Sequence, residues 1–197
     1  HIRTPDFPAD ESAIDLIIPA SRAFGTGQHE TTAGCLAMLG WLKQRGVRPR
    51  WIADIGTGTG LLAIGALKLF PTANVIASDI DPVCAEIVEE NAGNNAVALG
   101  QRPGALHYVT APGMNHPALA ARAPYDLLIA NILAGPLIEL APDFAHTLMP
   151  GARVILAGLL TTQEAKVTRA YQRQGLRVER RIADGDWSIL CLRNVRG

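Results

Sequence analysis

The chain is poor in cysteine and in aromatic residues, and its charges balance. Only 3 of its 197 residues are cysteine, 5% are aromatic, and 18 basic residues stand against 18 acidic ones. The odd number and wide spacing of Cys35, Cys84 and Cys191 argue against a disulfide framework or a metal site and suit a reducing cytosol. A net charge of zero gives no long-range attraction to polyanions, so no direct nucleic acid partner is predicted, although a local basic patch stays possible.

The chain also lacks a long hydrophobic run. Its longest apolar stretch, residues 127–138, is interrupted by Asn131, Gly135 and Pro136 and is too short to span a bilayer. No signal peptide pattern is visible. We therefore expect a cytoplasmic protein with no membrane contact, and the sequence makes no prediction about its oligomeric state. With 48% hydrophobic residues, a chain of this length can bury one large core.

Strand-like and helix-like segments alternate along the chain, as in a doubly wound α/β sheet. The expected strands span residues 14–18, 51–55, 75–79, 105–109, 125–130, 153–157, 176–182 and 187–193. The expected helices span residues 31–45, 61–70, 82–93, 136–148 and 162–174. Residues 93–124 read as a loose connection around one strand, and residues 149–151 as a turn. We predict a Rossmann-like, mostly parallel seven-stranded sheet that ends in an antiparallel hairpin with its turn at residues 183–185.

A glycine-rich junction follows the strand at residues 51–55. Gly56, Gly58 and Gly60 alternate there and lead straight into a helix. Glycine removes the Cβ atoms that would keep a ligand off the backbone and permits positive φ, and a helix start offers unpaired N–H groups. The next strand ends in Asp79, near the spacing at which an acid meets ribose hydroxyls. A nucleoside cofactor is predicted; the alternative is a tight turn with no ligand.

Two cofactors compete for this junction. A dinucleotide fingerprint can be read from Gly58 to Ala63, but its first glycine lies four residues beyond the strand end at Asp54. The pattern that begins at Asp54, with a glycine at every second position up to Gly60, fits better and resembles the class I methyltransferases that bind S-adenosylmethionine. In those enzymes the second acid, here Asp79, holds the ribose. Asp81 precedes a proline and reads instead as a helix N-cap.

A buried-looking strand at residues 125–130 ends in the amide of Asn131. Chemistry in such a fold lies at the carboxyl ends of the strands. The Asn131 carbonyl oxygen can accept a hydrogen bond from a substrate N–H and orient the nitrogen lone pair without carrying a charge. The alternative is an asparagine that caps the following turn. Asp126, set back within the strand, is expected to bond to backbone.

Residues 23–32 read Ala-Phe-Gly-Thr-Gly-Gln-His-Glu-Thr-Thr and could simply be a flexible entry to a helix that is capped at Thr31. Residues 130–137 read Ala-Asn-Ile-Leu-Ala-Gly-Pro-Leu. Together with the glycine loop and the Asp79-Ile80-Asp81-Pro82 segment, these residues resemble the bacterial methyltransferases of large-subunit ribosomal protein eleven. The resemblance extends from about Ile14 to the last strand; its first and last segments are distinctive, whereas many methyltransferases share the other two.

The resemblance implies specific residue roles. Thr32, Gly56, Asp79 and Asn131 occupy the family's S-adenosylmethionine-binding positions, Gly58 joins them from the glycine loop, and Asn131 is the candidate catalytic residue. His29 either braces its loop or contacts ligand. The implied activity is transfer of methyl groups to lysine or α-amino groups of a large-subunit ribosomal protein.

The resemblance also implies a domain organisation. Residues 1–197 form the methyltransferase domain, with residues 1–30 as a lead-in strand and a loop that covers the cofactor. The family's N-terminal substrate-recognition domain has no counterpart in this sequence. Three other functions stay open: a methyltransferase for a small-molecule amine, a nicotinamide-dependent oxidoreductase domain, and a binding module that has lost turnover.

Overall fold

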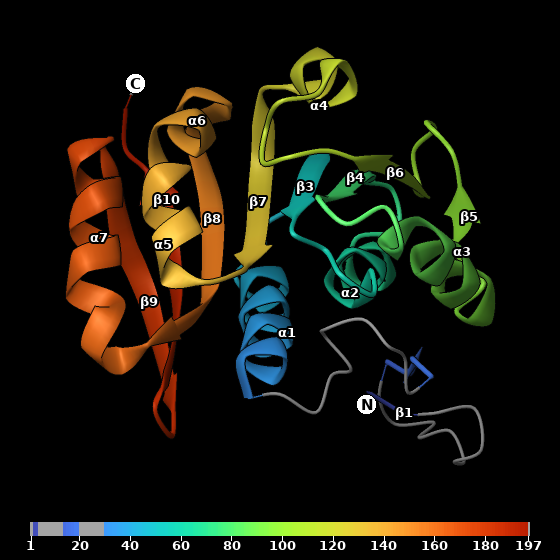
Figure 1. Cartoon of the computed structure of the whole chain (residues 1–197), viewed down its shortest axis with the longest axis horizontal. Helices are drawn as coiled ribbons and strands as arrows, with labels where there is room; N and C mark the ends of the chain where they lie inside the picture. Colours follow the sequence, from blue (N-terminus) through green and yellow to red (C-terminus); the bar gives the residue numbers. More distant parts are fainter. Residues whose placement is uncertain (1, 4–13, 20–29, 197) are drawn as a thin grey trace.

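The structure is a computed structural model that describes residues 2–3, 14–19 and 30–196 (Figure 1). Its main sheet contains eight strands, in the spatial order β5 (Ala98–Leu99), β6 (Ala105–Thr110), β4 (Asn74–Asp79), β3 (Trp51–Ile55), β7 (Tyr125–Asn131), β8 (Leu148–Leu160), β10 (Trp187–Asn194) and β9 (Leu176–Asp184). The first six strands in this order, β5, β6, β4, β3, β7 and β8, are parallel to one another. Strand β10 pairs antiparallel with both β8 and β9. The predicted parallel sheet with a terminal hairpin is confirmed, with β5 as one strand more than predicted.

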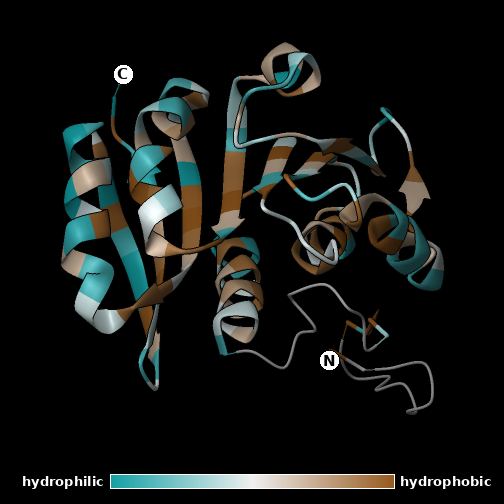
Figure 2. Ribbon diagram, viewed as in Figure 1, coloured by the Kyte–Doolittle hydropathy of each residue, from teal (hydrophilic) through white to brown (hydrophobic). Residues whose placement is uncertain are grey.

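Helices cover both faces of this sheet. On one face, α1 (Glu30–Gln44), α2 (Leu61–Leu69) and α3 (Cys84–Asn94) pack over a buried cluster that includes Ile52 and Ile129. On the other face, a second cluster lies under α4 (Pro117–Arg122), α5 (Ala134–Glu139), α6 (Ala141–His146) and α7 (Glu164–Arg173). Successive strand residues point to opposite faces, and a sheet buried on both sides needs apolar residues at nearly every position. The mostly apolar strands β3 and β7 meet that need, with Asp54 and Asp126 as their charged residues. Figure 2 shows the hydrophobic colour concentrated in the central strands and in α2.

The N-terminal residues add a small separate sheet. Strand β1 (Ile2–Arg3) pairs in parallel with β2 (Leu16–Ile17). The strand predicted at residues 14–18 is therefore shorter than expected and lies outside the main sheet. The side chain of Asn95 holds it at the end of α3, because Oδ1 accepts the Ile17 amide at 2.9 Å and Nδ2 donates to the Ile17 carbonyl at 2.7 Å.

Several predicted boundaries were wrong for local reasons. The helix expected at residues 136–148 is two short helices, α5 and α6, because Pro142 in the first turn of α6 has no N–H to continue the α5 ladder. Residues 93–124 contain α4 in addition to β5, and α4 begins where the His116 ring accepts the Ala118 amide ahead of Pro117. The helix expected at 162–174 begins with a single 3₁₀ turn, η1 (Thr161–Gln163).

Two turns also differ from the prediction. The turn expected at residues 149–151 lies inside β8, where Gly151 has φ +77° and the pairing with β7 shifts register. In the hairpin, β9 continues to Asp184, so the turn consists of Gly185 and Asp186. Within the described residues, no helix combines the length and apolar character needed to cross a membrane.

Candidate functional site

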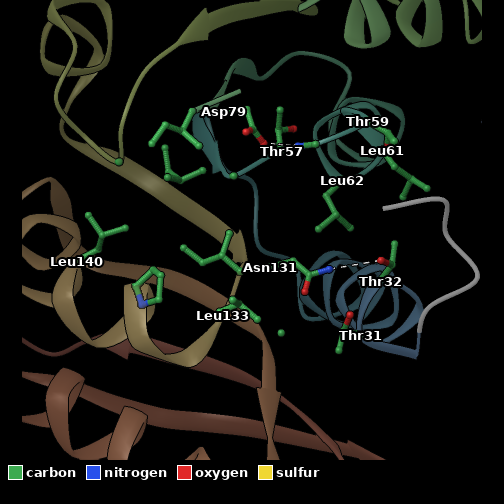
Figure 3. A pocket seen from close by; sticks show the side chains of 18 of the residues that line it. Thr31, Thr32, Thr57, Thr59, Leu61, Leu62, Asp79, Asn131, Leu133 and Leu140 are labelled. Carbon is green, nitrogen blue, oxygen red and sulfur yellow. Dashed lines mark hydrogen bonds between the residues drawn. The ribbon is translucent and has the colours of Figure 1, made fainter. Parts of the chain in front are cut away.

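A cavity of about 580 Å³ opens at the carboxyl ends of the central parallel strands (Figure 3). Its wall is built by the turn after β3, by the ends of β4, β6 and β7, by the first turn of α1, and by Trp187 at the start of β10. Ligands of open α/β sheets bind at this edge, where the strand order reverses. All five predicted site residues line the cavity: Thr32, Gly56, Gly58, Asp79 and Asn131.

The glycine loop has the backbone that its sequence predicts. Gly56, Gly58 and Gly60 have φ values of +73°, +55° and +79°. A Cβ on Gly56 would overlap the side chain of Ile132 from the neighbouring strand end. The Gly56 amide donates to the Ser78 carbonyl at 2.8 Å, which ties the loop to the end of β4. Only glycine satisfies both the positive φ and the close approach at position 56.

Asp79 accepts hydrogen bonds from the backbone of the loop and also lines the cavity. Its Oδ2 accepts the Gly58 amide at 2.8 Å and its Oδ1 accepts the Asp81 amide at 3.0 Å. Each carboxylate oxygen has a second lone pair, so the group can also accept hydroxyl donors from the cavity. Among the cavity-lining residues that the structure describes, Asp79 is the only charged one.

Asp81 lies outside this set. The N-cap of α3 is Val83, which has no side-chain cap, so the predicted N-cap role of Asp81 is wrong and Asp81 instead braces the turn before the helix. Its Oδ1 accepts the Val83 amide at 3.0 Å. The helix α3 itself begins at Cys84, two residues later than expected.

Asp54 lies beneath the loop and is fully buried. Burial raises the pKa of its carboxyl from 3.8 to about 7; the hydrogen bond from the Thr57 hydroxyl opposes this shift, and the charge of Asp79 adds to it. That hydrogen bond, from Thr57 Oγ1 to Asp54 Oδ2, is 2.6 Å long. The first acid of the loop pattern therefore holds the glycine loop from below rather than lining the cavity.

Asn131 ends β7 and faces the first turn of α1. Its Nδ2 donates to Thr32 Oγ1 at 3.3 Å, and Thr32 itself is buried (Figure 3). The next helix, α5, has Leu133 at its N-cap and no side-chain cap, so the alternative role of Asn131 as a turn cap is wrong. Its Oδ1 has no hydrogen bond within the described part of the chain, which leaves a neutral acceptor at the cavity wall.

Asp126, by contrast, bonds to backbone as expected. Its Oδ2 accepts the amides of Arg50 and Trp51, each at 2.9 Å. Arg50 and Trp51 lie at the start of β3, so these two hydrogen bonds fix the start of β3 beside β7. His29 lies outside the described residues.

Sequence reasoning missed an apolar rim around the cavity. Ile80 and Leu133 are each 71% exposed and line it, together with Pro136, Leu140 and Trp187. The sequence did contain a signal for this rim, because a large apolar residue that follows a polar strand end lies at the exposed edge of the sheet. Gly158 was also missed: its φ is +81°, and a Cβ there would collide with the Ile132 carbonyl.

Comparison with known proteins gives a consistent result. The family model described as "Ribosomal protein L11 methyltransferase (PrmA)" matches residues 2–195. A curated ribosomal protein L11 methyltransferase from Sinorhizobium fredii is 44% identical over 179 residues, which is 91% of this chain and 59% of that protein.

Solved structures agree with this match. The ribosomal protein L11 methylase from Lactobacillus delbrueckii subsp. bulgaricus superposes with a TM-score of 0.77 at 30% identity, covering 97% of this chain and 91% of that one. The N-methyltransferase NodS from Bradyrhizobium japonicum, solved with S-adenosyl-L-homocysteine, shares the fold at 12% identity, with a TM-score of 0.63 and coverage of 86% and 90%.

These matches confirm the predicted class I methyltransferase fold and the predicted family. The chain spans about 59% of the length of the Sinorhizobium relative. The family model nevertheless covers almost every residue of the chain, including the glycine loop and all residues of the cavity wall. The chain belongs to the ribosomal protein L11 methyltransferase family.

Proposed function

We propose that this chain is the catalytic domain of an S-adenosylmethionine-dependent N-methyltransferase that acts on lysine or α-amino groups of a large-subunit ribosomal protein. The observation that carries the proposal is the cavity itself. Its one charged wall residue in the described part of the chain is Asp79, and the neutral amide of Asn131 lies in the same wall. The family membership supplies the class of substrate.

The charge of the cavity favours a cationic nucleoside over a dinucleotide. A pyrophosphate needs free loop amides or a basic side chain. Here the Gly58 amide is already bonded to the Asp79 carboxylate, whose negative charge repels phosphate. No lysine, arginine or histidine lines the cavity within the described residues. A cofactor that carries a sulfonium and an ammonium group suits these residues, and this argues against the nicotinamide-dependent alternative.

The wall offers groups that suit parts of S-adenosylmethionine. The free lone pairs of Asp79 would accept the ribose hydroxyls, and the positive φ of Gly56 and Gly58 lets the ligand approach the backbone closely. Thr32 and Asn131 approach from the opposite wall. When bound, the cofactor supplies a methyl group already activated by its attachment to a positively charged sulfur.

Asn131 would position the acceptor amine. Because Nδ2 is held by Thr32 and Asn131 lines the cavity, Oδ1 stays available to accept one N–H of a neutral amine. This hydrogen bond would direct the nitrogen lone pair, and correct positioning alone can supply on the order of 7–11 kcal/mol of the barrier. A carboxylate at this place would instead favour the unreactive ammonium form.

The amine must first lose a proton. With a reference pKa of about 10.4, a lysine needs roughly 4.6 kcal/mol to become neutral at pH 7, against about 1 kcal/mol for an α-amine. The apolar rim formed by Ile80, Leu133, Leu140 and Trp187 would lower that pKa by desolvation. Deprotonation therefore needs no dedicated base among the described residues.

A thermal shift experiment tests the cofactor. S-adenosylmethionine at one hundred times its Kd is expected to stabilise the fold by about 2.7 kcal/mol, which raises Tm by roughly 5–10 °C for a domain of this size. A nicotinamide dinucleotide is expected to leave Tm unchanged. Asp79→Asn should lose the shift, whereas Asp81→Asn, the matched control, should keep it. A shift produced by the dinucleotide alone would overturn the proposal.

The acceptor is tested by label transfer. Methyl-labelled cofactor and the purified chain would be incubated with a large-subunit ribosomal protein or with a metabolite extract. Label is expected in lysine or α-amino groups of the ribosomal protein. Label found only in a small molecule would favour the amine methyltransferase alternative. Cofactor binding without any single-turnover product would identify a binding module.

The domain organisation is part of the proposal. We infer that residues 1–197 bind the cofactor and carry out the transfer. Part of the Sinorhizobium relative lies outside its match to this chain. We assign recognition of the ribosomal protein to that part. This chain alone should therefore bind the cofactor normally, but its KM for the protein substrate should be higher than that of the full-length relative.

A further inference from the structure

The balanced charge of the chain conceals a segregation of charge along it. Residues 153–197 contain nine basic and four acidic residues, whereas the preceding residues have an acidic excess. This basic segment contains most of β8 and all of α7, β9 and β10, at one end of the main sheet. Figure 2 shows β9 as largely hydrophilic.

Three arginines form a row across three neighbouring strands. Arg193 of β10 pairs directly with Arg153 of β8 on one side and with Arg177 of β9 on the other. All three lie on the sheet face that α1 covers elsewhere. Cys191, two residues before Arg193, is buried in the cluster beneath α1, and Leu176 and Val178, which flank Arg177, pack on the opposite face.

The row continues to an aromatic side chain. The guanidinium of Arg180 lies 5.0 Å from the ring centre of Trp41 on α1, and that of Arg45 lies 5.8 Å from the same ring. Arg45, Arg177, Arg180 and Arg193 are exposed. We call Trp41, Arg45, Arg153, Arg177, Arg180 and Arg193 the arginine face.

The arginine face contains little negative charge. Glu179 binds Arg153 with two hydrogen bonds, of 2.8 Å and 3.2 Å. Among the described residues of this region, one other arginine forms an ion pair: Arg181 binds Glu164, on the α7 side. Within the described residues, Arg45, Arg177, Arg180 and Arg193 have no ion pair, so four unpaired guanidinium groups share one surface.

This arrangement works against stability. Like charges placed directly opposite each other on neighbouring strands are destabilising. Charged residues on an edge strand prevent edge-to-edge aggregation, but that explains only Arg177 and Arg180 on β9, because β10 and β8 are interior strands. A costly local arrangement without a structural benefit points to a function.

We propose that the arginine face binds the phosphate backbone of RNA. Every basic residue of the face is arginine, whose planar guanidinium fork matches phosphate oxygens and also stacks on bases. Trp41 offers a ring beside these forks. Arg153, Arg177 and Arg193 lie at the end of β8 and β10 away from Trp187 and Gly158, which line the cavity, so RNA here would leave the cavity open. RNA binding at the arginine face requires no methyl transfer in the cavity.

Fluorescence anisotropy of the full chain with a labelled single-stranded RNA of about 20 nucleotides tests the proposal. At about 0.1 M salt, Arg177→Gln and Arg193→Gln are each expected to weaken binding roughly fivefold and to reduce the slope of log K against log salt by about 0.7. The matched control, Arg169→Gln on α7, removes the same charge from the other side and should change neither. Equal effects of all three substitutions, or no binding by the unaltered chain, would overturn the proposal.

Three further measurements separate loss of RNA binding from loss of folding and from binding of another polyanion. Tm and the S-adenosylmethionine shift should be unchanged or raised in Arg193→Gln, because the substitution relieves repulsion and lies far from the cavity. If Arg193→Gln does not fold, Arg177→Gln on the edge strand still decides the question. A polyglutamate chain of matched charge should compete poorly with RNA; equal competition would contradict an RNA site and indicate an acidic protein partner.

Discussion

The side chain of Asn131 depends on a single hydrogen bond to Thr32. Thr32→Val keeps the shape of the side chain but removes the acceptor, which frees the amide to rotate. We expect kcat to fall by about tenfold to a hundredfold, because a small misplacement of a positioning group has costs of this size. Thr32→Ser keeps the hydroxyl and should stay within roughly threefold of the unaltered chain. Equal kcat values for the valine and serine variants would show that the bond has no catalytic role.

Asp54 should make stability depend on pH. Its pKa is about 7 when folded, above its ordinary value of 3.8, so the folded chain holds a proton that the unfolded chain loses between these values. The stabilisation is fully present below about pH 4 and is lost as pH rises through 7, by up to about 4 kcal/mol. Asp54→Asn should remove this component. Urea unfolding of both proteins at pH 5 and pH 8 measures it; an identical pH dependence would contradict the burial argument.

The sequence predicted site residues well where residue type and strand position coincide. Asp79 and Asn131 are polar groups at the ends of apolar strands, and topology places such ends together. The hydrogen bond between Asn131 and Thr32 joins residues 99 positions apart, which no local pattern encodes. Trp187 reaches the cavity from the terminal hairpin, so its place depends on the order of strands and not on its neighbours in sequence.

At the scale of elements, the glycine loop is the least tolerant segment. Gly56→Ala would force a Cβ into Ile132 at a φ of +73°. We expect a loss of more than about 1 kcal/mol in stability, together with the loss of cofactor binding. Gly40→Ala, inside α1 and with no atom near its Cβ position, is the control and should stabilise the fold by about 1 kcal/mol. Denaturant unfolding distinguishes them, and a neutral Gly56→Ala would show that the loop can relax.

Elements were predictable where a continuous apolar run sets them. The strands β3, β4 and β7 are buried on both faces and match their apolar runs closely. The two-residue strand β5 was missed because only its pairing with β6 creates it. The break between α5 and α6 was not predicted, although Pro142 indicates it. The helical spacing of apolar residues continues across the break and suggests a single helix.

At the scale of the whole molecule, net charge was the weakest predictor of how charge is distributed on the surface. A sum of zero says nothing about where charges gather, and the fold brings Arg153, Arg177 and Arg193 together from three neighbouring strands of the sheet. The zero sum holds for the whole chain but not for the arginine face.

This segregation predicts how stability responds to salt. At about 0.01 M ionic strength the Debye length of roughly 30 Å lets the arginines repel one another, whereas at 0.1 M it falls to about 10 Å. Each directly opposed pair is worth roughly 0.2–1 kcal/mol. Raising the concentration of sodium chloride should therefore raise Tm by roughly 1–3 °C. Chloride is the right anion for this test, because phosphate or sulfate could bind the guanidinium groups and stabilise the fold by mass action.

Arg193→Gln separates this repulsion from general salt effects. Arg193 is the middle member of the row, so its loss removes both direct oppositions at once. The variant should melt higher than the unaltered chain at low salt and gain less from added sodium chloride. The control Arg169→Gln on α7 should keep the full salt response. If Tm of the two variants rises equally with salt, the three arginines of the row do not repel one another measurably. Other contacts must then offset the repulsion between their guanidinium groups.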